Sequence, residues 1–143
     1  MVGLCTGGYV RYLPRRNVIT SSNTARLPDV LVVDDDTAVA AVVARYLEHA
    51  GMRVQVAASG ADALRVMENG AAGVRVVLTD LRMRGMSGLG LAGELAVRHP
   101  GTKVLFMSGC PDNDALPGPF IPKPFKEHQL LTAVQRLRNE PAA

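Results

Sequence analysis

The chain has 143 residues, of which 48% are hydrophobic and 20% charged, and a formal net charge of +3. This composition excludes a disordered protein and suits one domain with an aliphatic core, because aromatic residues make up only 4%. Residues 1–28 contain four arginines and no acid, which leaves 12 of the 16 basic residues against all 13 acidic ones in residues 29–143. We therefore expect a basic flexible arm over residues 1–28, followed by a nearly neutral domain over residues 29–143 that does not bind nucleic acid directly.

Two further classes are excluded by the sequence. No apolar stretch approaches the roughly 18–20 residues that span a bilayer, and the N-terminus lacks the apolar segment of a secretory signal. The two cysteines, Cys5 and Cys110, offer neither a disulfide framework nor the spacing of a metal site. We expect a cytoplasmic protein with reduced thiols and no membrane contact.

Short apolar runs alternate with segments of helical periodicity along the domain. Residues 30–33 form a β-branched run that is typical of a strand buried on both faces. Asp36 is expected to cap the following helix, and Gly51 to end it. Further strands are predicted at residues 53–58, 74–78, 104–107 and 120–121, and further helices at residues 61–68, 89–99 and 127–138.

Strands that alternate with helices indicate parallel pairing, so we predict an α/β fold with a doubly wound, five-stranded parallel sheet. The connection over residues 109–119 is unusual, because its 11 residues include three prolines and two glycines. Such a segment cannot form a full helix. We expect the helix between the fourth and fifth strands to be short or absent.

Polar side chains follow four of the predicted strands. Asp34 and Asp35 follow the first strand, Asp80 the third, Ser108 the fourth and Lys123 the fifth. In an open parallel sheet, functional groups gather beyond the carboxyl ends of the strands. Neighbouring carboxylates need a compensating cation, for which Mg²⁺ is well suited, and a lysine beside them suits a phosphate. The pattern predicts a phosphoryl site.

Four motifs together resemble the receiver domain of response regulators in two-component signalling. They are LVVDDD at residues 31–36, LTDLRMRGMSG at 78–88, FMSG at 106–109 and KPF at 123–125. The resemblance covers residues 30–138 and implies a flavodoxin-like sheet of strand order 2-1-3-4-5. It also implies Mg²⁺ as cofactor and a place in a phosphorelay.

The resemblance further implies a role for each acidic residue of the site. Asp80 would accept a phosphoryl group from a sensor histidine kinase or a histidine phosphotransfer protein. Asp35 would bind Mg²⁺ directly and Asp34 largely through water, together with Asp80 and the backbone carbonyl of Arg82. Arg84 departs from the pattern, since the family usually has proline there.

The remaining implied roles concern the fourth and fifth strands. Ser108 would be the switch hydroxyl that bonds the phosphoryl oxygen. Lys123 would pair with the phosphoryl group, and its bond to Pro124 is expected to be cis. Phe120 occupies the position of the switch aromatic.

Two alternatives stay open. The motif of Asp34 and Asp36 loosely resembles haloacid-dehalogenase-type phosphatases, with Asp34 as nucleophile and Asp36 as acid/base, although Asp80 would then have no role. Alternatively, the chain is an interaction module that no longer responds to phosphate.

The expected output is binding and not turnover. Five residues follow residue 138, so we expect a stand-alone receiver that is not an enzyme beyond its own phosphotransfer and dephosphorylation. The shortened fourth connection predicts a monomer or weak dimer that does not form through the usual surface of that helix. We expect the fifth strand and the last helix to bind an unidentified downstream protein.

Overall fold

The computed structural model describes residues 28–69, 74–109, 116 and 118–140. Its five strands form one parallel sheet in the order β2-β1-β3-β4-β5. The strands are β1 (Val30–Val33), β2 (Val54–Ala57), β3 (Val76–Asp80), β4 (Lys103–Ser108) and β5 (Phe120–Pro122). The helices are α2 (Thr37–His49), α3 (Gly60–Glu68), α4 (Gly88–Arg98) and α5 (Glu127–Asn139). The predicted doubly wound fold and strand order are confirmed.

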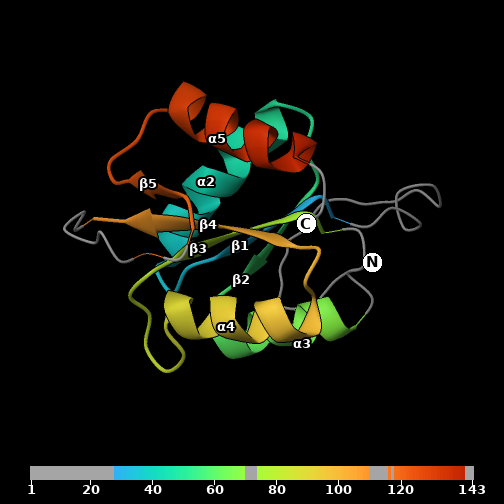
Figure 1. Ribbon diagram of the computed structural model, residues 1–143. Coiled ribbons are helices and arrows are strands. Elements are labelled where there is room, and N and C mark those ends of the chain that lie inside the picture. The colour runs from blue at the N-terminus through green and yellow to red at the C-terminus, as the bar shows by residue number, and fades with distance from the viewer. Residues whose placement is uncertain (1–27, 70–73, 110–115, 117, 141–143) are drawn as a thin grey trace, which may run out of the picture.

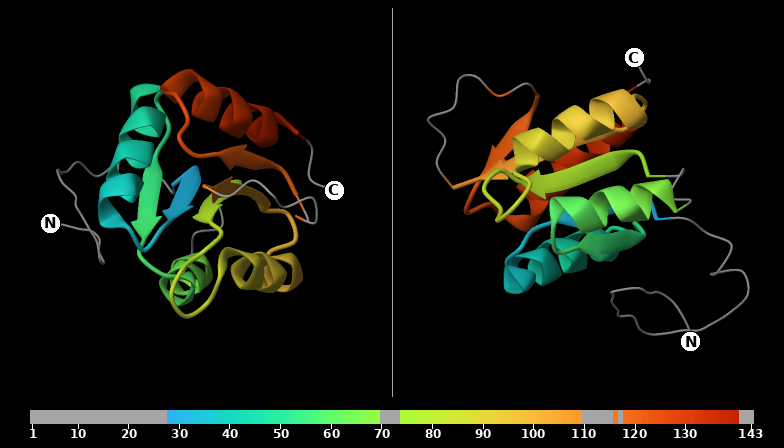
Figure 2. Two further views of the ribbon diagram at one scale, coloured as in Figure 1. Left: turned by 90° about the vertical axis from the view of Figure 1, so that its left-hand side faces the viewer. Right: turned by 90° about the horizontal axis from the view of Figure 1, so that it is seen from below.

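The helices form two layers around the sheet. Helices α2 and α5 cover one face, and α3 and α4 cover the other (Figure 1). The end-on view separates the two pairs (Figure 2, left). None of the helices in the described ranges is both long and apolar enough to cross a membrane.

Strand β1 lies inside the sheet, between β2 and β3. All four of its residues are fully buried, as the β-branched run predicts. Val30 and Val32 face the core under α2 and α5, whereas Leu31 and Val33 face the core under α3 and α4. Because side chains alternate along a strand, a strand covered on both faces needs apolar residues at every position.

Helix α2 begins and ends as the sequence predicts. The carboxylate of Asp36 accepts hydrogen bonds from the backbone N–H groups of Ala38 and Val39, at 3.0 and 3.3 Å. At the other end, Gly51 has a φ of +87° and donates its N–H to the carbonyl of Glu48 at 2.9 Å. The cap and the stop fix the length of the helix that follows Asp34 and Asp35.

The predicted element boundaries differ from the observed ones by two residues or fewer. The largest difference is at β3, which begins at Val76 and not at residue 74, and which includes Asp80 as its last residue. Asp80 is therefore held by the strand itself and not by a loop.

Several expectations fall on residues outside the described ranges. Residues 1–27 of the predicted arm, which include Cys5, belong to this group, as do Cys110 and most of the connection over residues 109–119. The flexibility of the arm, the missing helix and the oligomeric state stay predictions.

Glycines 51 and 93 provide a matched test of backbone conformation. A Cβ atom at either position would meet no atom within 4 Å, but only Gly51 has a positive φ. We expect Gly51→Ala to lower the free energy of unfolding by about 1–2 kcal/mol, because L-residues disfavour this conformation. Gly93→Ala, inside α4, should raise it by about 0.5–1 kcal/mol. Urea denaturation measures both, and equal changes would contradict this account.

Candidate functional site

Two of the predicted acidic residues contact the predicted lysine. The Nζ atom of Lys123 lies 2.9 Å from Oδ1 of Asp80 and 3.4 Å from Oδ2 of Asp34. These residues come from the carboxyl ends of β1 and β3 and from the segment after β5. The backbone N–H of Lys123 donates to the carbonyl of Ser108 at 2.7 Å, which ties this segment to the end of β4.

The register of the sheet brings the carboxylates together. Val33 pairs with Thr79, so Asp34 follows β1 at the level where Asp80 ends β3. Asp34, Asp35 and Asp80 each offer a carboxylate oxygen, and these oxygens lie within 4.8 Å of one another. Asp34 is 1% exposed, and its Oδ1 accepts the N–H of Asp36 at 2.9 Å.

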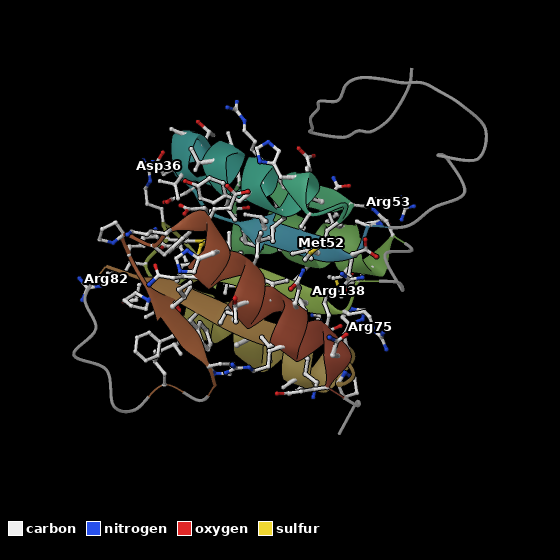
Figure 3. The ribbon with its side chains drawn as sticks, turned by 90° about the horizontal axis from the view of Figure 1, so that it is seen from above. Asp36, Met52, Arg53, Arg75, Arg82 and Arg138 are labelled. Atoms are coloured by element: carbon white, nitrogen blue, oxygen red, sulfur yellow. The ribbon has the colours of Figure 1, made fainter. Side chains whose placement is uncertain are left out.

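This donor set fits Mg²⁺. Three carboxylate oxygens within 4.8 Å of one another match the preference of Mg²⁺ for hard oxygen ligands. Like charges this close favour a cation between them. Arg82, whose carbonyl the resemblance implies as a further ligand, lies in the segment between β3 and α4. Figure 3 shows Arg82 and Asp36 at the site end of the sheet, with Arg53 and Arg75 at the opposite end. The metal-binding role of each residue stays a prediction.

Burial and neighbouring charges shift the pKa values of both Asp34 and Lys123. Burial raises the pKa of the Asp34 carboxyl, and the charge of Asp80 adds to the effect, despite the Asp36 N–H and the charge of Lys123. Burial alone would lower the pKa of Lys123, but its hydrogen bond to Asp80 and the charges of both carboxylates outweigh burial and raise that pKa. Ionising the Asp34 carboxyl in the folded domain therefore costs free energy, whereas the Lys123 amine stays protonated.

The remaining predicted residues lie at or near the same edge. Ser108 is 4% exposed at the end of β4, beside Pro122 of β5. Phe120 begins β5 opposite Phe106 and is 40% exposed. The peptide bond between Lys123 and Pro124 is cis. The functional roles of Ser108 and Phe120 stay predictions.

Two contacts of the segment between β3 and α4 were not foreseen. A Cβ atom on Gly88 would lie 2.3 Å from the carbonyl oxygen of Asp80, so the start of α4 packs directly on the backbone of that residue. The signal in the sequence is a glycine directly after the helix cap Ser87, where a better helix former would be expected. The second contact joins Arg84 to Asp35: the Arg84 N–H donates to Oδ2 at 3.2 Å, and Arg84 Nε lies 3.6 Å from the same oxygen.

Comparison with known proteins identifies the family and the fold of the chain. The family described as the response regulator receiver domain matches residues 30–135. The chain belongs to this family. Its strand order is that of a receiver domain.

Individual relatives agree with this assignment. The sensor kinase CckA of Brucella abortus is 39% identical over 116 residues, which are 76% of this chain and 12% of the kinase. The receiver domain of NtrX from Brucella abortus has a TM-score of 0.70 at 29% identity, covering 77% of this chain and 98% of that one. The response regulator TrrA from Thermotoga maritima, solved in complex with Mg²⁺–BeF, has a TM-score of 0.69 at 25% identity, covering 76% and 96%.

The raised pKa of Asp34 predicts a stability gain in Asp34→Asn without metal. A raised carboxyl pKa means that folding is favoured at low pH and that this contribution is lost as pH rises through the raised value. Asparagine carries no charge at any pH. At pH 7 in EDTA we therefore expect the variant to unfold at a higher urea concentration than the unaltered receiver domain. The difference should vanish as pH falls below the ordinary carboxyl pKa. Asp36→Asn, an exposed cap where Asn serves equally, should show no gain, and a loss of stability in Asp34→Asn at pH 7 would contradict the argument.

The contact of Gly88 with Asp80 predicts a costly substitution. Gly88→Ala places a methyl group against backbone atoms of the receiver's β3, so we expect unfolding to become easier by about 1–3 kcal/mol. Gly93→Ala in the same helix is the control and should not destabilise. Urea denaturation compares the two, and an undiminished stability of Gly88→Ala would show that α4 does not sit on Asp80.

Proposed function

We propose that this chain is the phosphoacceptor of a two-component phosphorelay. Asp80 takes a phosphoryl group from the phosphohistidine of a sensor histidine kinase or of a histidine phosphotransfer protein. The observation that carries the proposal is the 2.9 Å contact of Lys123 Nζ with Asp80 Oδ1, beside the carboxylates of Asp34 and Asp35. A lysine bound to the acceptor carboxylate is already placed to pair with a phosphoryl group on it.

The proposed transfer is a single displacement at phosphorus. One carboxylate oxygen of Asp80 forms the new bond as the phosphorus–nitrogen bond of the donor breaks, and the leaving imidazole nitrogen keeps the electron pair and takes a proton. Lys123 stabilises the transferred phosphoryl oxygens, and the hydroxyl of Ser108 donates to one of them. Mg²⁺ held by Asp34, Asp35, Asp80 and the carbonyl of Arg82 would offset the negative charge that gathers there.

In this proposal the chain signals in the cytoplasm by changing a binding surface, and it catalyses no reaction on another substrate. The transfer onto Asp80 and its later hydrolysis are the only reactions it performs. Phe120 and α5 lie on either side of Lys123 in the chain and would form the surface that responds to it. The similarity to CckA and NtrX supports a kinase partner, and the Mg²⁺–BeF complex of TrrA supports the pocket chemistry.

The phosphatase alternative is not favoured by the site. It needs Asp36 as acid/base, but the Asp36 carboxylate caps α2 by accepting two backbone N–H groups. It also leaves Asp80, the carboxylate that Lys123 contacts most closely, without a role.

Phosphorylation with acetyl phosphate and Mg²⁺ tests the proposal. We expect a mass increase of one phosphoryl group, located on Asp80 by borohydride reduction and peptide mass spectrometry. Asp80→Asn should reduce the modification to background, because the attacking carboxylate is gone. Asp62→Asn, on the surface of α3, is the matched control and should be modified as the unaltered chain is.

The same experiment separates the alternatives. Label on Asp34 in place of Asp80 would support the phosphatase. No label, together with unchanged amide NMR spectra on adding Mg²⁺ and beryllofluoride, would support the interaction module that does not respond to phosphate.

A further inference from the structure

We propose that Arg84 is a built-in competitor of Mg²⁺ for Asp35, and that it sets the metal affinity of the pocket. This inference rests on the proposed function, since it assumes that Mg²⁺ binds among Asp34, Asp35 and Asp80. It concerns a residue at which the chain departs from the proline usual in the family.

The contact is direct and involves a ligand carboxylate. Oδ2 of Asp35 accepts the backbone N–H of Arg84 at 3.2 Å and lies 3.6 Å from Nε of the same residue. Asp35 is 27% exposed at its side chain, so the guanidinium reaches it from the solvent side, where the Arg84 side chain is 93% exposed. A hydrated cation that approaches Asp35 therefore competes with the guanidinium for this oxygen.

The backbone of Arg84 is held in place by its neighbours. Met83, directly before it, is 9% exposed and packs in the core under α3 and α4. Gly85, directly after it, has a φ of +77°, which turns the chain away. The N–H bond to Asp35 is thus a feature of the anchored segment, whereas the guanidinium contact depends on the side chain alone.

The charges of the pocket show what the guanidinium does. Lys123 contacts Asp80 and Asp34, and Arg84 contacts Asp35, so each of the three carboxylates has a cationic partner. Five side chains with three negative and two positive charges attract a divalent cation less than the carboxylates and Lys123 alone would. Binding of Mg²⁺ requires the guanidinium to leave Asp35 or to share it, and the two cations repel each other.

The competition weakens when the pocket carries a phosphoryl group. The aspartyl phosphate adds negative charge, which the guanidinium then helps to balance. Arg84 should therefore disfavour Mg²⁺ in the resting domain more than in the phosphorylated one, which makes the two binding events depend on each other.

Calorimetric titration of the chain with MgCl₂ tests this inference at low ionic strength. We expect Arg84→Ala to bind Mg²⁺ about two- to fivefold more tightly, the size of an exposed ion pair, and the difference to shrink at high salt. The alanine keeps its N–H bond to Asp35, so the anchored segment is preserved. Arg84→Lys keeps the charge and should bind Mg²⁺ less tightly than Arg84→Ala.

Arg136→Ala is the matched control. Arg136 is exposed and lies in the last turn of α5. Arg138 of the same turn contacts Asp29, which precedes β1 at the opposite end of the sheet from the acidic site. Its removal changes the net charge equally but should leave the Mg²⁺ affinity unchanged. With beryllofluoride present, the gain in Arg84→Ala should be smaller than with Mg²⁺ alone.

The failures of the two proposals are distinguishable. If the unaltered chain binds no Mg²⁺, the proposed function and this inference are both wrong. If it binds Mg²⁺ but Arg84→Ala binds it no more tightly at low salt, only the role of Arg84 is wrong. An equal gain in Arg136→Ala would show that net charge, and not the Asp35 contact, sets the affinity.

Discussion

The structure depends on holding three carboxylates within 4.8 Å of one another beside a single lysine. In water such groups would separate, because like charges repel and each prefers its own hydration shell. The protein prevents this by placing the carboxylates at the ends of the adjacent strands β1 and β3. The hydrogen bonds and buried side chains of these strands hold the strand ends in place. The apolar sheet is therefore the frame that makes the charged pocket possible.

Each part of that frame has a recognisable task. The full burial of β1 on both faces fixes the position of Asp34, while Asp80 is held as the last residue of β3. Gly88 lets α4 begin against the backbone of Asp80, so the strand end is supported from the side as well. Lys123 arrives from the far edge of the sheet and is tied to β4 through the carbonyl of Ser108.

Most of this arrangement could be predicted from the sequence, because it follows from the periodicity of apolar residues and from the charged residues that follow the strands. The continuous β-branched run predicts a strand covered on both faces, and charged residues after several such runs predict a common edge. The contacts of Arg84 and Gly88 could not be predicted in this way. Both depend on the path of the segment between β3 and α4, which has no periodic pattern. The Arg84 contact depends also on which of the 12 basic residues in the domain reaches which acid. A net charge near zero describes the domain correctly but hides the pairing of Lys123 with Asp80 and of Arg84 with Asp35.

The same pairing sets the free-energy cost of bringing these charges together. Without metal, ionised Asp34 opposes folding, since burial and the charge of Asp80 raise its pKa, and Lys123 offsets this only in part. Any cation or phosphoryl group that binds the folded domain alone adds its binding free energy to stability. In the proposed function, the binding free energy of Mg²⁺ and of the phosphoryl group would offset this cost, and the surface near β5 and α5 would respond to them. Lys123 connects the two, because its side chain contacts the carboxylates while its backbone directly follows β5.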